Sequence, residues 1–69
     1  MKFHEREALI DSIIALRRQA DKQFEAGEPN AARTTLNALL ADCDKLLQEE
    51  PTNSWVVNHR QKAIIQKGT

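Results

Sequence analysis

The sequence predicts an all-α fold: a long antiparallel helical hairpin plus a short third helix, which together make a small three-helix bundle. Apolar residues recur at steps of three and four along most of the chain, the spacing of one face of a helix. Only two glycines and two prolines interrupt that pattern, so few turns are expected. Tyrosine is absent and β-branched residues do not alternate with polar ones, which disfavours strands.

The 69 residues are too few for two separate cores, so residues 1–69 are expected to form a single helical domain. Hydrophobic residues make up 41% and charged residues 29%, a balance typical of globular domains rather than disordered chains. A domain this small buries only about 60% of its unfolded surface. We therefore expect marginal stability unless the chain associates with a second protein chain.

The first helix is expected from about residue 3 to residue 26. One stripe of this helix is apolar, with Ile10 and Ile14 widening it on one side. Its polar residues, among them Arg17, Arg18 and Asp21, are expected to face solvent. The predicted core residues of this helix are Leu9, Ile13, Leu16, Ala20 and Phe24.

The stretch "FEAGEPNAA" is expected to turn the chain back on itself. Gly27 suits a left-handed position that ends the first helix, because glycine has no Cβ to clash there. Pro29 suits the first position of a new helix, and Asn30 is an alternative cap. A break this short between two amphipathic helices makes them run antiparallel.

The second helix is expected at residues 29–49, where Pro51 pushes Glu50 out of helical geometry. Asn53 or Ser54 then caps a third helix, roughly residues 54–67. The predicted core residues in these two helices are Ala32, Leu36, Leu39, Cys43, Leu46 and Val56.

The third helix carries more apolar side chains than one face can bury. Val56, Ala63 and Ile64 are expected to dock against the hairpin, which leaves Trp55 and Ile65 without a place in the core. Self-association is one way to cover such surface, so we expect a homodimer.

The segment from Ala20 to Pro51 resembles the helical hairpins of tetratricopeptide repeats and of microtubule-interacting-and-transport domains. Ala20, Gly27 and Ala32 match the small residues that pack such hairpins closely, and "LLQEEPTN" resembles a closing leucine-acid-proline stretch. Phe24 lies one position from the usual aromatic, Pro51 comes about two turns late, and no second repeat follows. The three-helix layout is closer to the transport domain, whose helices bind partner helices in a groove. The resemblance covers under half of the chain and implies only the shape of the fold.

Charge is balanced overall but uneven along the chain. The formal net charge is zero, so no global field attracts nucleic acid or an anionic membrane. Residues 27–50 carry five acidic and two basic side chains, whereas residues 51–69 carry three basic side chains and no acidic one. The two segments are expected to attract each other, or each to attract a partner of opposite charge.

Catalytic and metal-binding motifs are not evident. Cys43 lies on an apolar stripe, where a thiol is usually a small buried hydrophobe, and His4 and His59 are far apart in sequence. Ser12 and Ser54 lack nearby histidine–acid partners. We therefore predict no enzyme, no cofactor and no metal. With no signal peptide pattern, no long apolar run and one cysteine, a cytoplasmic location is the simplest expectation.

Two functions remain for a domain of this kind. The first is a protein–protein interaction module that acts as an adaptor, regulator or inhibitor of a larger protein. Its expected contact residues are Trp55, His59, Arg60, Lys62 and Ile65, because Trp and Arg are enriched among interface hot spots.

The alternative is nucleic-acid binding through "NHRQK" in the third helix, whose side-chain types contact base edges and phosphates. A helix-turn-helix needs a shorter second helix than this one, and three positive charges make only a modest electrostatic footprint. The residues expected to act in this alternative are Asn58, Arg60, Gln61, Lys62 and Lys67, with Arg17 and Arg18 adding to them in a dimer.

Overall fold

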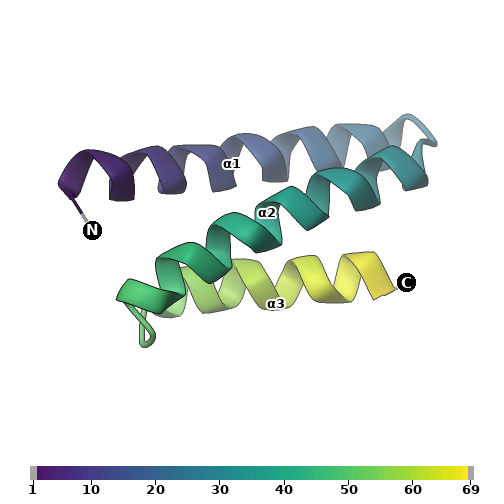
Figure 1. The fold of residues 1–69 in the computed structure, drawn as a ribbon. Helices are drawn as coiled ribbons and strands as arrows, with labels where there is room; N and C mark the ends of the chain where they lie inside the picture. Colours follow the sequence, from purple (N-terminus) through teal and green to yellow (C-terminus); the bar gives the residue numbers. More distant parts are fainter. Residues whose placement is uncertain (1, 69) are drawn as a thin grey trace.

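A computed structural model describes residues 2–68, which form three α-helices. They are α1 (Phe3–Glu25), α2 (Pro29–Glu49) and α3 (Ser54–Gly68). The predicted fold class is confirmed, and the helix bounds differ from the expected ones by one residue at two ends. Helix α2 lies between the other two and runs antiparallel to both (Figure 1). No Cα of α1 lies within 8 Å of a Cα of α3, so α2 supplies the backbone packing for both neighbours.

The turn between α1 and α2 is the one that the sequence predicts. Gly27 has a φ of 75°, a region in which a side chain would be strained. Its N–H donates to the Phe24 carbonyl (3.1 Å), and the Glu28 N–H donates to the Gln23 carbonyl (2.8 Å). These two bonds satisfy carbonyls at the end of α1, a Schellman motif. Pro29 is the first residue of α2, as expected.

The link between α2 and α3 is fixed by side chains. Glu50 leaves helical geometry, with φ −132° and ψ 69°, immediately before Pro51. Asn53, rather than Ser54, caps α3, because its Oδ1 accepts a hydrogen bond from the Val56 N–H (3.3 Å). Arg6 of α1 donates two hydrogen bonds to Glu50 in this link, from Nε to Oε2 (2.6 Å) and from Nη2 to Oε1 (3.2 Å).

The core lies along α2, and most of the predicted core residues are buried in it. Leu9, Leu16 and Phe24 are only partly buried and pack around its edge. Ile64 was expected to dock against the hairpin, but it is 41% exposed. Because α3 packs on a single helix, only a narrow stripe of α3 is covered. The fully buried apolar residues are Ile13, Ala20, Ala32, Leu36, Leu39, Cys43, Leu46, Val56 and Ala63.

Arg17 is the main exception to the expected solvent face of α1. Its side chain is 7% exposed, so the expectation that it faces solvent is wrong. Arg17 lies one helical turn from both Ile13 and Ala20, at the border of the core stripe, and it reaches α3 by hydrogen bonds. The long aliphatic stem of an arginine can cover apolar surface in this way.

Candidate functional site

Helices α1 and α3 point the same way on either side of α2 (Figure 1), and hydrogen bonds of side chains join α1 to α3. Arg17 of α1 donates hydrogen bonds to Gln66 and to the His59 carbonyl of α3, and Asp21 of α1 accepts one from Gln66. These bonds identify one stripe of residues on each helix. Both stripes follow steps of four, three and four. We call this surface the α1–α3 face. It consists of Ile10, Ile14, Arg17 and Asp21 from α1 and Trp55, His59, Lys62 and Gln66 from α3.

Arg17 lies near the centre of this face and donates hydrogen bonds from α1 to α3. Its Nη1 donates to Gln66 Oε1 and its Nη2 to the His59 carbonyl (2.8 Å). Gln66 Nε2 in turn donates to Asp21 Oδ1 (3.4 Å). Arg17 Nε is buried and has no hydrogen-bond partner among the described residues. The pKa of Arg17 is lowered, chiefly because burial penalises its charge, although Asp21 and Cys43 act in the opposite direction.

No carboxylate among residues 2–68 forms a salt bridge with Arg17. The hydrogen-bond acceptors of its guanidinium are a neutral amide and a backbone carbonyl. Charge is expensive to bury without an opposite charge close by. The α1–α3 face therefore contains a buried cation whose charge is only partly compensated by the described residues.

Trp55 and His59 form an aromatic pair on the α3 side of the face. Their ring centroids are 4.2 Å apart with an interplanar angle of 48°. Trp55 is 37% exposed, whereas His59 Nδ1 is buried and has no partner in the described part of the chain. The pKa of His59 is lowered, first by burial and then by the nearby charges of Arg17 and Lys62. The neutral imidazole is thus the form that the fold favours.

This shift predicts a measurable pH dependence of stability. An unfolded histidine titrates near pH 6.5, so below that pH the unfolded chain binds a proton that folded His59 binds only at lower pH. Stability should therefore fall as the pH drops from about 6.5 through the folded pKa, and should be unaffected by this group at higher pH. Melting temperatures between pH 7 and pH 5 should fall less for His59→Asn than for the wild type.

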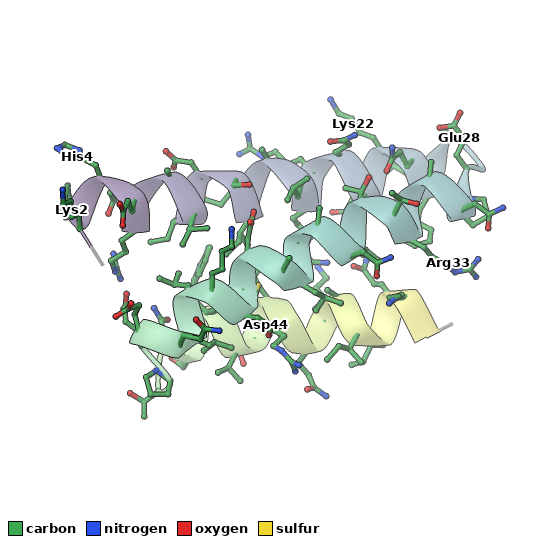
Figure 2. The ribbon with its side chains drawn as sticks, in the orientation of Figure 1. Lys2, His4, Lys22, Glu28, Arg33 and Asp44 are labelled. Carbon is green, nitrogen blue, oxygen red and sulfur yellow. The ribbon has the colours of Figure 1, made fainter. Side chains whose placement is uncertain are left out.

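The matched control is His4→Asn, because His4 is exposed at the amino end of α1 (Figure 2). Glu50 does not confuse the measurement. The hydrogen bond from Arg6 lowers the pKa of Glu50, so its contribution is lost only in acid, below the ordinary glutamate value of about 4.3. An equal pH slope in the His59 variant and the wild type would contradict the prediction.

The five expected partner-contact residues do not all gather in one place. Trp55, His59 and Lys62 lie on the α1–α3 face. Arg60 lies on the opposite flank of α3, where its Nε contacts Asp44 Oδ1 of α2 at 2.9 Å; Asp44 is labelled in Figure 2. Ile65 is 58% exposed on the outer side of α3. Lys62 is exposed and forms no salt bridge with the described residues, so it is the most available cation of the set.

The residues expected for nucleic-acid binding are more scattered. Arg17 is buried, and Arg60 is paired with Asp44. Arg18 lines a separate shallow depression on α1 together with Gln19 and Lys22. The remaining members, all exposed on α3, are Asn58, Gln61, Lys62 and Lys67.

Some members of the face were not anticipated as site residues, namely Asp21, Gln66, Ile10 and Ile14. The signal that would have found them is the shared four-three-four spacing in the two outer helices. Where this face ends near the hairpin, an open hollow of about 440 Å³ is lined by Asp21, Phe24, Glu25 and Gln66.

The remaining candidates for function are the thiol of Cys43, clusters of metal-ligating side chains and membrane-spanning helices. Cys43 is fully buried, and burial raises the pKa of its thiol to about 11, so its nucleophilic thiolate form is disfavoured. Within residues 2–68, no three His, Cys, Asp or Glu side chains are arranged to hold a metal ion. None of the helices described is long and apolar enough to cross a membrane.

Comparisons with known proteins give no family assignment: no family model, no curated protein and no solved structure matches this chain.

Proposed function

We propose that this chain is a non-catalytic protein–protein interaction module, an adaptor, regulator or inhibitor of a larger protein. The observation that carries the proposal is the exposed apolar surface of α3. Trp55 (37%), Ile64 (41%), Val57 (43%) and Ile65 (58%) all remain exposed on one short helix. Patches of large exposed apolar side chains often mark surfaces that bind other proteins.

Trp55 lies apart from the other three residues, on the α1–α3 face with His59 and Lys62, and it is the anchor that we propose for a partner protein. Tryptophan is enriched among the few residues that dominate binding energy, and Trp55 is held in place by its ring contact with His59.

Self-association is the second part of the proposal. Val57, Ile64 and Ile65 lie outside the α1–α3 face, so a homodimer formed through them leaves that face open. Light scattering should give the mass of a dimer at high concentration and that of a monomer for Ile65→Lys. A wild-type monomer at every concentration would remove the dimer but not a different partner.

Nucleic-acid binding is the weaker alternative, since burial of Arg17 and pairing of Arg60 reduce the available positive charge. Anisotropy of a labelled DNA duplex at about 50 and 200 mM salt decides it, because phosphate contacts are lost steeply over that range.

The interaction function is tested by site-specific photo-crosslinking in cells of the organism that encodes the chain. A benzophenone amino acid replaces Asn58, which is exposed on α3 one helical turn from both Trp55 and Lys62. In the control it replaces Lys22 at the hairpin end of α1 (Figure 2). We expect a protein adduct at position 58 that Trp55→Ala abolishes, with little adduct at position 22. Equal adducts at both positions, or none, would contradict the proposed function.

A further inference from the structure

We infer that the α1–α3 face binds an acidic amphipathic helix of a partner protein. Apolar side chains of that helix pack on Ile10, Ile14 and Trp55. A carboxylate of the helix pairs with the exposed Lys62 and is attracted by the charge of the buried Arg17 beneath it. This inference rests on the proposed function and names the chemistry of the partner.

The apolar part of the face follows from the register of α1 and α3. Because Arg17 bonds to His59 and Gln66, and Asp21 bonds to Gln66, Asp21 lies level with Gln66. The equal spacing of the two stripes then places Ile14 level with His59 and Ile10 level with Trp55. Ile10 and Ile14 are half-buried and Trp55 is exposed, so the amino end of the face offers apolar surface to a partner.

The charged part of the face lies one turn further along. The Arg17 guanidinium is desolvated and has no salt bridge with the described residues, while Lys62 on the facing stripe is exposed and likewise unpaired by any described carboxylate. Residues 51–69, which include all of α3, contain no acidic residue. A carboxylate from outside would compensate both cations, and Coulomb attraction is strongest where water is excluded.

Charge also argues against a second copy of this chain as the occupant. Arg17 and Lys62 lie near the middle of the two stripes. A two-fold symmetric pairing of this face brings each residue near the axis close to its own copy. Arg17 and Lys62 would then meet like charges, which costs free energy.

The hollow at the hairpin end gives the direction of the partner helix. Asp21 and Glu25 line this hollow, and negative charge favours the amino end of a helix. The partner helix should therefore begin there and run antiparallel to α1 and α3. From Asp21 to Ile10 the face spans about 17 Å at 1.5 Å per residue, so roughly three turns of partner helix cover it.

The test uses synthetic helical peptides with one leucine stripe flanked by glutamates, made in four versions that place the glutamates at successive positions around the helix. Control peptides carry lysine in place of each glutamate. Binding is measured by peptide anisotropy and by the fluorescence of Trp55, the only tryptophan. We expect at least one acidic peptide to bind about tenfold or more tightly than its lysine control, because opposite charges meet at the face and like charges are excluded.

Two matched variants locate the binding site. Lys62→Glu and Lys67→Glu change the charge equally, at exposed positions of the same helix, but only Lys62 belongs to the α1–α3 face. Lys62→Glu should weaken the acidic peptide about tenfold or more, since the new carboxylate repels the peptide and neutralises Arg17. Lys67→Glu should change the affinity by less than about threefold, the effect of a distant screened charge.

Three outcomes would overturn the inference. They are binding by none of the acidic peptides, equal binding by acidic and lysine peptides, and equal losses in the two lysine variants. A concentration-dependent change in Trp55 fluorescence without peptide that persists in Ile65→Lys would identify a second copy as the occupant of this face instead. If crosslinking at position 58 captures a partner whose contacting segment lacks acidic residues, the proposed function stands and this inference fails.

Discussion

Leu36→Ala should lower the free energy of unfolding by about 2–5 kcal/mol, the usual cost of removing a large buried side chain and leaving a cavity. Leu36 is fully buried on α2, the one helix that packs against both others. Total stabilities of small domains begin at about 5 kcal/mol. The variant should therefore melt well below the wild type, or be unfolded at 25 °C, as followed by circular dichroism at 222 nm.

Ile65→Ala is the matched control, because it also shortens a branched aliphatic side chain but at a position that is 58% exposed. Its cost should be below about 1 kcal/mol, since little area returns to water. Comparable melting temperatures for the Leu36 variant and the wild type would show that the core is not organised around α2.

The packing of α2 could be predicted from sequence because helical period alone determines it. Leu36, Leu39 and Leu46 repeat at three- and four-residue steps, and Gly27 with Pro29 marks the reversal that faces α1 toward them. These are local signals. They required no knowledge of where α3 lies.

Residues outside the α2 stripe could not be placed in this way. Arg17 is polar and borders the stripe of α1, so its burial depends on α3 supplying the His59 carbonyl and Gln66 as acceptors. Ile64 is apolar, yet it stays exposed because no third helix covers its side of α3. Likewise, Trp55 and Lys62 could be predicted as contact residues from their side-chain types, but the placement of Ile10 and Ile14 near them follows only from the parallel alignment of α1 and α3.

Arg17→Met should leave the free energy of unfolding unchanged within about 1 kcal/mol, or raise it. Methionine fills a similar, unbranched volume, and the change removes a buried charge that has no salt bridge with the described residues and whose Nε lacks a partner among them. Replacing buried charged groups by apolar residues of similar size is often neutral or stabilising. Urea denaturation measures the change.

Gln66→Leu should have the opposite effect. It removes the acceptor of Arg17 Nη1 while the charge stays buried, which should cost about 1–3 kcal/mol. The double variant Arg17→Met/Gln66→Leu should recover part of that loss, because it no longer contains the buried guanidinium that lost its hydrogen-bond acceptor. A larger loss in the free energy of unfolding for Arg17→Met than for Gln66→Leu would show that the role of Arg17 is to stabilise the fold.

The same Arg17→Met variant separates stability from binding. If Arg17 contributes little to stability, its burial in the α1–α3 face is best explained by what its charge does for a partner, since unneeded buried charge tends to be replaced by apolar side chains. The variant should then fold as well as the wild type and bind the acidic peptides about tenfold more weakly, the loss expected for one close charge pair. A normally folded variant with unchanged affinity would remove Arg17 from the binding site and leave Lys62 as its only cation on this face.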